Sequence, residues 1–200
     1  MSSGGAEPRA AVTVKSEATR ESILEGAKAA FAARGFAGTT IGEITERSRV
    51  SRAGFYYYFR DKRELFVELG SQTYLETVQA ASSLAALPDP ATFDDILGWV
   101  VDWFRYLDVH GAYLIRSAED APTDDDFRVA VSRFQRRAAV LLGAEVARRS
   151  TASLGDEGEI GLSLMALLER IWLLLQTAAY PADRDEMTAA VARVVGALLR

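Results

Sequence analysis

The chain has 200 residues, a formal net charge of −5 and no cysteine, with 49% hydrophobic and 26% charged residues. This composition is ordinary for a soluble globular protein of one or two domains, and the lack of cysteine excludes disulfides and thiolate chemistry. No apolar run is long enough for a membrane span, and the first residues do not resemble a signal peptide, so we expect a cytoplasmic protein.

Charge is distributed unevenly along the chain. Residues 1–64 carry a net charge of +3, whereas residues 65–200 carry −8. A local basic region is what attracts nucleic-acid phosphates, and an acidic remainder would confine such contact to one part of the molecule.

The first third begins with a tail and a helix. Residues 1–15 are rich in Ser, Gly and Ala without periodicity, so we expect a disordered tail, with a basic arm for a DNA minor groove as the alternative. Residues 16–34 predict an amphipathic helix with Ile23, Ala27 and Phe31 on one face. Gly35 suits the end of this helix, and Phe36 can fold back onto it.

Residues 39–65, TTIGEITERSRVSRAGFYYYFRDKREL, predict two short helices joined by a tight turn. Thr40 and Glu43 have the spacing of a capping box, and Ser51 is a second N-cap residue. Two capped helices at this separation are typical of a helix-turn-helix, whose second helix can lie in a DNA major groove.

This stretch resembles the DNA-binding signature of TetR-type transcriptional repressors. The matching features are the Thr39-Thr40 pair, the Val50-Ser51-Arg52 start, the aromatic run at 55–59 and Lys62. The chain departs from the family at Ser48-Arg49, where the family usually has Ala-Gly. Because positive φ is easiest for glycine, Arg49 is either mildly strained or part of a different turn, and it can point at a phosphate.

The resemblance and the residue types together predict the DNA contacts. We expect Arg52, Ala53, Gly54 and Tyr57 to meet base edges or lie beside them. The residues expected to hold phosphates are Thr39, Thr40, Arg49, Ser51, Tyr56, Tyr58 and Lys62.

The remainder of the chain predicts helices throughout. A long helix over residues 62–87 ends at Pro88, and breaks at His110-Gly111, Ala121-Pro122, Ser153–Gly155 and Tyr180-Pro181 separate five more. These five span residues 91–109, 112–120, 123–149, 156–179 and 182–199. The expected fold is all-α with about nine helices: a tail at 1–15, a helix-turn-helix DNA-binding domain at 16–62, and a helical ligand-binding and dimerisation domain at 63–200.

Aromatic residues at helical spacing, as in residues 91–109, are more often core than ligand site. The family resemblance instead implies a small-molecule cavity in the second domain. Its expected lining residues are Trp99, Trp103, Leu107, Tyr113, Phe134, Met165, Glu169, Trp172 and Gln176. Glu169 and Arg170 can alternatively form a salt bridge or an inter-subunit contact. The Leu-x-Leu-Met…Glu-Arg pattern is similar to the branch with the mycobacterial ethionamide-resistance repressor, which implies an elongated hydrophobic ligand.

The helices over residues 156–179 and 182–199 are apolar on several sides, which predicts a homodimer through a four-helix bundle about a two-fold axis. A dimer would also place two recognition helices about 34 Å apart on a palindromic operator.

Few residues point to an enzyme. His110 is the one histidine, and it suits either an interaction with a helix C-terminus or a place in the ligand pocket. A magnesium site is conceivable at Glu119, Asp120, Asp124, Asp125 and Asp126, but the preference of acidic residues for a first helical turn explains these residues better. We expect no enzymatic activity, no cofactor and no metal.

The sequence therefore predicts a ligand-responsive, dimeric transcriptional regulator, most simply a repressor. It would bind double-stranded operator DNA and be released by a small hydrophobic effector. The alternative is an all-α small-molecule-binding or scaffolding protein without DNA activity.

Overall fold

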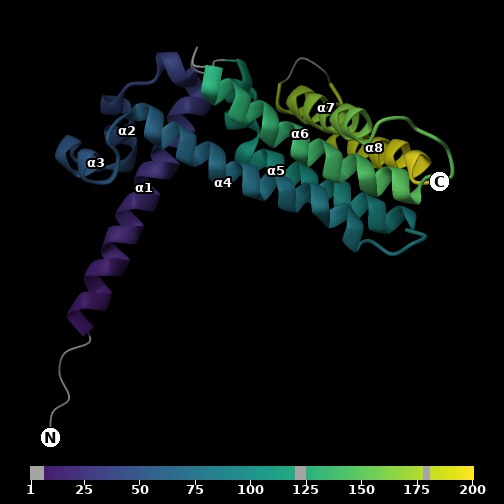
Figure 1. Cartoon of the computed structure of the whole chain (residues 1–200), viewed down its shortest axis with the longest axis horizontal. Coiled ribbons are helices and arrows are strands. Elements are labelled where there is room, and N and C mark those ends of the chain that lie inside the picture. Colours follow the sequence, from purple (N-terminus) through teal and green to yellow (C-terminus); the bar gives the residue numbers. More distant parts are fainter. Residues whose placement is uncertain (1–6, 120–124, 178–180) are drawn as a thin grey trace, which may run out of the picture. The chain divides into compact units, whose positions relative to one another are not determined.

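A computed structural model describes residues 7–119, 125–177 and 181–200 of the chain. These residues form helices joined by turns and irregular segments, with no strand, which confirms the all-α fold (Figure 1). The helices in the described ranges are α1 Glu7–Gly38, α2 Ile41–Ser48, α3 Arg52–Tyr58, α4 Lys62–Ser82, the 3-10 helix η1 Ser83–Ala86, α5 Phe93–Glu119, α6 Asp125–Arg149, α7 Glu157–Gln176 and α8 Arg184–Leu198. None of them is long and apolar enough to cross a membrane.

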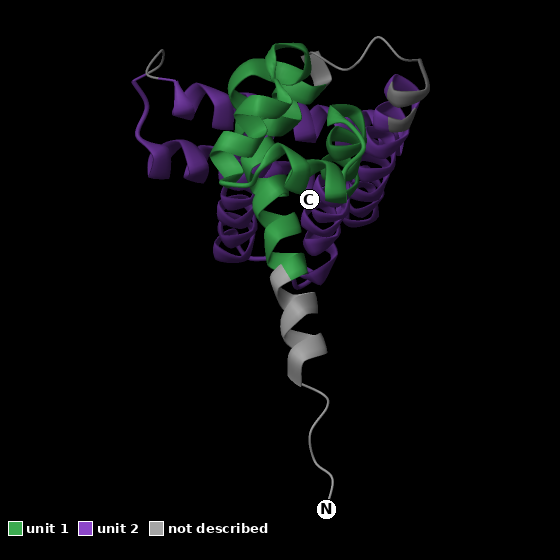
Figure 2. Cartoon of the chain, turned by 90° about the vertical axis from the view of Figure 1, so that its left-hand side faces the viewer, with its two compact units in different colours: residues 1–71, 113–122 green, residues 72–112, 123–200 purple. Residues whose placement is uncertain are grey.

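The described chain forms two compact units, coloured separately in Figure 2. The first unit comprises residues 7–71 and 113–119, and the second comprises residues 72–112, 125–177 and 181–200. Both α4 and α5 therefore contribute to both units. The division falls within α4 after Ser71, whereas the sequence placed a boundary at residues 62–63.

The first unit is built on α1. This helix begins at Glu7, so residues 7–15, expected in a disordered tail, are helical, while residues 1–6 lie outside the described ranges. Its predicted apolar face is buried. Gly35 has φ 69° and ψ 178°, which interrupts the helix where the sequence placed its end, and the Phe36 ring stacks on Phe31 with centroids 6.0 Å apart.

An aromatic cluster completes the core of the first unit. The Phe66 ring lies 5.0 Å from Phe31, 4.9 Å from Phe36 and 5.5 Å from Tyr113. Tyr113 also donates a hydrogen bond to the Phe66 carbonyl (3.0 Å), and burial raises the pKa of its hydroxyl. The C-terminal part of α5 is thereby part of the first unit's core.

In the second unit, α5 supplies most of the aromatic core, and its large buried side chains there are Ile96, Trp99, Val100, Trp103, Phe104 and Leu107. The predicted break at His110-Gly111 is wrong, because α5 runs through both residues. A Cβ atom at position 111 would stand 2.7 Å from the Trp172 ring, so Gly111 admits that ring and does not end the helix.

Helices α6 and α7 approach each other backbone to backbone at two glycines. A Cβ atom on Gly143 would stand 1.7 Å from the Glu157 carbonyl oxygen, and one on Gly161 would stand 1.8 Å from the Ala139 carbonyl oxygen. No other residue type fits at these two positions without moving a helix.

Candidate nucleic-acid interface

The N-terminus of α2 is fixed by the predicted capping box. The Glu43 backbone N–H donates to Thr40 Oγ1 (3.2 Å), and the Thr40 backbone N–H donates to Glu43 Oε2 (3.1 Å). The Thr40 N–H lowers the pKa of the Glu43 carboxyl most strongly, and Arg34 at 2.8 Å lowers it further. Two orphan backbone donors are thus satisfied, which sets where the helix-turn-helix begins.

The turn after α2 passes through Arg49 in the left-handed conformation, with φ 55° and ψ 34°. Within the described ranges Arg49 is the one non-glycine residue with positive φ. Its N–H donates to the Glu46 carbonyl (3.2 Å), and the Val50 N–H donates to the Thr45 carbonyl (3.0 Å). The turn therefore keeps a geometry suited to glycine and carries a strained arginine there, at a cost of about 1 kcal/mol.

Helix α3 has a buried face and an exposed face. Ser51 Oγ accepts the Gly54 N–H (3.0 Å) as the predicted N-cap, and a Cβ atom at position 54 would stand 2.6 Å from Val50 Cγ1. Gly54 thus lets α3 sit against the turn. Phe55 and Phe59 anchor the helix in the core. The side chains that face outward are those of Arg52, Ala53, Tyr56 and Tyr57.

We use the name "exposed α3 surface" for Arg49, Arg52, Ala53, Tyr56 and Tyr57. Tyr56 is 51% exposed and Tyr57 is 78% exposed. Neither Arg49 nor Arg52 has a side-chain hydrogen bond or ion pair to any described residue. These two guanidinium groups are therefore available to an external anion.

Other arginines of the same unit are already paired. Arg34 binds Glu43, Arg60 binds Glu64 at 3.3 Å, and Arg20 binds Glu68. The sequence alone does not separate these paired cations from the available ones, because their partners depend on how the helices pack.

Two predicted phosphate contacts have structural roles instead. Thr39 is buried, and its hydroxyl donates to the carbonyls of Gly35 (2.7 Å) and Ala30 (3.2 Å), so the hydroxyl is engaged inside the fold. Lys62 Nζ donates to the carbonyls of Phe36 (2.6 Å) and Thr39 (2.7 Å). It also lies 4.3 Å from the centre of the Phe36 ring, and burial lowers its pKa. Lys62 therefore holds the segment between α1 and α2.

The Tyr58 hydroxyl also has an internal partner, since it lies 3.1 Å from Ser16 Oγ in a half-buried position. The hydroxyls of Thr40 and Ser51 are exposed, although each accepts a backbone N–H. A phosphate contact from these three residues stays a prediction.

The residues predicted to line a ligand pocket are divided between the units. Trp99, Trp103, Leu107, Met165 and Trp172 are buried in the second unit, and the Trp99 and Trp103 rings lie 5.3 Å apart. The indole N–H groups of Trp99 and Trp103 are buried and have no acceptor among the described residues.

Two other predicted pocket residues, Phe134 and Tyr113, have different neighbours. Phe134 on α6 stacks on Tyr74 of α4 with centroids 4.1 Å apart. Tyr113 belongs to the aromatic cluster of the first unit, whereas the other eight belong to the second unit.

Asp108, which the sequence did not indicate, binds two of the predicted pocket residues. Its Oδ1 accepts from Trp172 Nε1 (2.8 Å) and from Gln176 Nε2 (2.9 Å), and its Oδ2 accepts from Arg184 (2.7 Å). Asp108 joins α5 to α7 and α8. Its partners are 64 to 76 residues away in sequence, so no local pattern predicts them.

Glu169 is largely buried, which raises the pKa of its carboxyl. Neither Glu169 nor Arg170 forms an ion pair with any described residue, so the predicted salt bridge between them is absent there. His110 lies inside α5, where its Nε2 is 2.7 Å from Glu76 Oε2 and its ring stacks on Tyr106 at 4.9 Å. It is therefore not at the helix end that the sequence suggested.

No cluster of metal-binding side chains occurs in the part of the chain that the structure describes. The acidic side chains of Glu119, Asp120, Asp124, Asp125 and Asp126 lie outside that part.

The helix-turn-helix has recognisable relatives. Residues 23–69 match the family described as bacterial regulatory proteins, tetR family. The HTH-type transcriptional repressor SCO4008 of Streptomyces coelicolor is 35% identical over 97 residues, which is 48% of this chain and 45% of that protein. The chain thus spans less than half the length of the curated relatives it matches first.

Solved structures resemble about nine tenths of the chain. The reduced form of E. coli NemR has a TM-score of 0.66 at 22% identity, over 88% of this chain and 95% of that one. A regulatory protein TetR from Rhodobacter sphaeroides has a TM-score of 0.68 at 15% identity, over 91% and 99%. These low identities show the fold alone. Residues 23–69 thus have the sequence signature of the tetR family of bacterial regulatory proteins, and the described helices share the fold of these two solved structures.

Proposed function

We propose that the chain is a cytoplasmic, homodimeric repressor of transcription that binds a palindromic operator and is released by a small hydrophobic ligand. The exposed α3 surface carries this proposal. Its arginines have no internal partner among the described residues, while Phe55 and Phe59 hold the opposite side of the same helix in the core. A short rigid helix with exposed Arg and Tyr side chains is suited to enter a major groove.

Different residues would contact the bases and the phosphates. Arg52 can donate two hydrogen bonds to one guanine edge, while Ala53 and Gly54 leave room for the bases. Arg49, Tyr56 and Tyr57 suit the neighbouring phosphates, with Tyr58 and the cap residues Thr40 and Ser51 beside them. Thr39 and Lys62 are not part of this contact set.

Helices α7 and α8 are the proposed dimer surface. Each exposes a large aliphatic side chain, Leu162 on α7 and Val194 on α8, and capping aspartates (Asp156 and Asp183) start both helices. A two-fold pairing of these helices would cover both side chains and present two α3 helices to successive major grooves.

The proposed ligand site is the aromatic core of the second unit. Trp99 and Trp103 offer two buried indole donors within an otherwise apolar lining that includes Leu107 and Met165. An elongated hydrophobic molecule with a hydrogen-bond acceptor suits such a lining, as the likeness to the ethionamide-resistance branch implies. A ligand that binds only the state unable to reach DNA would shift the population to that state.

Selection of bound sequences from random double-stranded DNA tests the proposal and yields the operator. Gel-shift titrations should then show weaker binding for Arg52→Ala and Tyr56→Phe by about tenfold each, one charged or hydroxyl contact being lost. Arg105→Ala, an exposed arginine of the second unit, is the matched control. Wild-type affinity in both α3 variants, or no selected sequence at all, would favour the alternative of a small-molecule-binding protein without DNA activity.

A further inference from the structure

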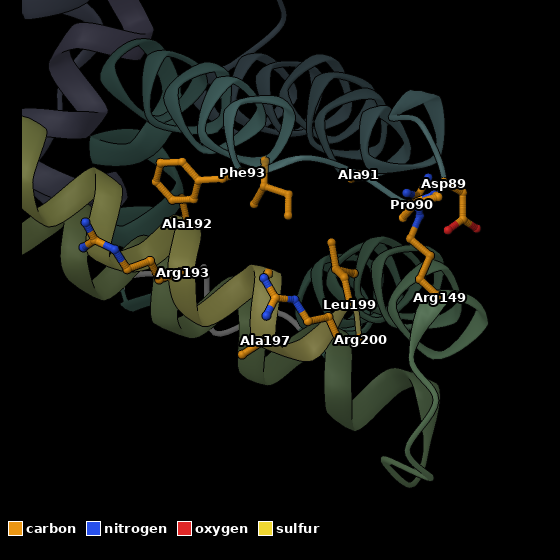
Figure 3. A pocket seen from close by; sticks show the side chains of 12 residues that line it. Asp89, Pro90, Ala91, Phe93, Arg149, Ala192, Arg193, Ala197, Leu199 and Arg200 are labelled. Carbon is orange, nitrogen blue, oxygen red and sulfur yellow. The ribbon is translucent and has the colours of Figure 1, made fainter.

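A pocket of about 330 Å³ opens in the second unit (Figure 3). Three stretches of chain form it: the segment from Asp89 into the start of α5, the end of α6 at Arg149, and residues 192–200 around the end of α8. Its volume is within the range of small-molecule sites. None of the nine residues predicted to hold the ligand lines it.

One wall of this pocket is rigid because Arg149 is fully engaged. The Arg149 side chain is 2% exposed, and it donates to the carbonyls of Leu84 (3.2 Å), Leu87 (2.8 Å) and Pro88 (2.7 Å). Its charge is balanced by Glu145 at 2.6 Å. Arg149 therefore shapes the pocket and offers no free charge to a ligand.

The floor is apolar. Ile96 and Ala192 are buried, and α8 reaches α5 closely at Gly196, where a Cβ atom would stand 3.2 Å from Ile96 Cδ1. The ring of Phe93, which is 43% exposed, borders the floor. These groups provide a contact surface for a small apolar body.

Two arginines of the lining have no ion pair with a described residue, while the main-chain carboxyl oxygen of Arg200 accepts hydrogen bonds from Thr151. Asp89 is the one carboxylate side chain among the lining residues, and it is already paired with Arg148 at 3.1 Å. Arg193 lies 5.8 Å from the centre of the Phe93 ring, and neither Arg193 nor Arg200 has an ion pair with a described residue. Two free guanidinium groups thus border an apolar hollow, although residues 65–200 are strongly acidic overall.

We propose that this pocket binds a small organic acid, whose carboxylate pairs with Arg193 and Arg200 and whose apolar body contacts Phe93 and Ile96. Guanidinium groups bind carboxylates in paired, directional hydrogen bonds, and the apolar floor disfavours a fully hydrated inorganic anion. The site is separate from the proposed effector site, and it does not depend on DNA binding.

Calorimetric titration without DNA tests the site, using benzoate and hexanoate as probes and benzyl alcohol, hexan-1-ol and inorganic phosphate as comparisons. We expect saturable binding of the two acids and weaker binding of the neutral alcohols and of phosphate. The double variant R193Q/R200Q should lose at least about tenfold in affinity for the acids, since two charge-assisted hydrogen bonds are removed.

Two further variants separate this site from other arginines. Ala197→Phe adds a ring to the exposed pocket rim and should abolish acid binding, whereas Arg105→Gln on α5 should leave it unchanged. Unchanged melting temperatures would establish that all variants are folded. No binding of either acid, equal binding of acids and alcohols, equal binding of phosphate, or full affinity in R193Q/R200Q would each overturn the proposal.

Discussion

The indole N–H of Trp172 on α7 donates a 2.8 Å hydrogen bond to Asp108 on α5, although 64 residues separate the two in sequence. One turn further along α5, Gly111 makes room for the six-membered part of the same indole ring. A side chain predicted to contact a ligand thus has both its N–H and its six-membered ring against α5. Trp172 therefore links α7 to α5.

Removing the Asp108 carboxylate, which accepts the Trp172 N–H, should therefore destabilise the second unit. We expect Asp108→Ala to lower the free energy of unfolding by about 1–3 kcal/mol, because the buried Trp172 N–H loses its partner. Asp102→Ala removes an exposed carboxylate that pairs only with Arg105 within the described chain, and should change stability by less than about 1 kcal/mol. Urea unfolding at one fixed protein concentration compares the two. Equal losses would contradict a special role for Asp108.

The glycine contact between α6 and α7 predicts a larger effect. Gly161→Ala would place a methyl group against the Ala139 carbonyl oxygen and should cost about 3 kcal/mol. Gly98→Ala on α5 is the matched control, because no atom lies within 4 Å of its added Cβ. That substitution should instead stabilise the helix by about 0.5–1 kcal/mol. Thermal unfolding of both variants measures the difference, and a stable Gly161→Ala protein would refute the close approach.

Arg49 predicts opposite changes in stability and in DNA affinity. Arg49→Gly relieves the left-handed strain and should raise the free energy of unfolding by about 0.5–1 kcal/mol. Loss of the guanidinium should weaken operator binding and reduce the slope of log affinity against log salt by about 1. Unfolding and salt-dependent gel shifts on the same preparation test both. An unchanged salt slope would show that Arg49 contacts no phosphate.

For Lys62 we expect a loss of stability and no change in the salt dependence of DNA binding. Lys62→Met leaves the Phe36 and Thr39 carbonyls without their donor and should destabilise the first unit by about 1–3 kcal/mol. The salt slope of DNA binding should stay at the wild-type value. Arg52→Met, with an unpaired exposed side chain, is the comparison that should lower the slope and leave stability nearly intact. A reduced slope for Lys62→Met would restore it as a phosphate contact.

Acid should weaken the second unit through Glu145. Hydrogen bonds from Arg148 and then Arg149 lower the pKa of its carboxyl to about 2, although partial burial opposes this. Because the folded pKa lies below the unfolded value near 4.5, the ionised carboxylate stabilises the fold at neutral pH. That contribution is lost as the pH falls from about 4.5 towards 2.

The variant Glu145→Gln should therefore be less stable than wild type at pH 7 and differ from it less at pH 3. Glu186→Gln, an exposed carboxylate without an ion pair in the described chain, should keep the wild-type pH profile. Urea unfolding at the two pH values measures both variants. A constant difference between Glu145→Gln and wild type would contradict this account.

Local features were predictable because their partners are close in sequence. The capping box of Thr40 and Glu43, the N-cap Ser51 and the interruption at Gly35 each involve residues within four positions of one another. Backbone geometry over so short a span depends on residue type more than on packing. The sequence left open whether Arg49 is strained or part of a different turn, and its φ of 55° agrees with the first alternative.

Long-range contacts were not predictable in this way. Gly111 looked like a helix break because its true partner, Trp172, is distant in sequence. The pocket at Arg193 and Arg200 is formed by three stretches that are separate in sequence, so no local sequence pattern predicts it. Tertiary packing decides which polar side chains remain free.

The place of Tyr113 in the first unit matters for the design of truncated or chimeric forms of this protein. Its ring and its hydrogen bond to Phe66 belong to the first unit, yet it comes 42 residues after the point where α4 leaves that unit. A truncated gene that stops at residue 71 would omit this piece of core and expose the aromatic rings that it covers. Chimeric regulators made by exchanging an N-terminal cassette would need a compatible residue from the recipient's own α5 to replace it.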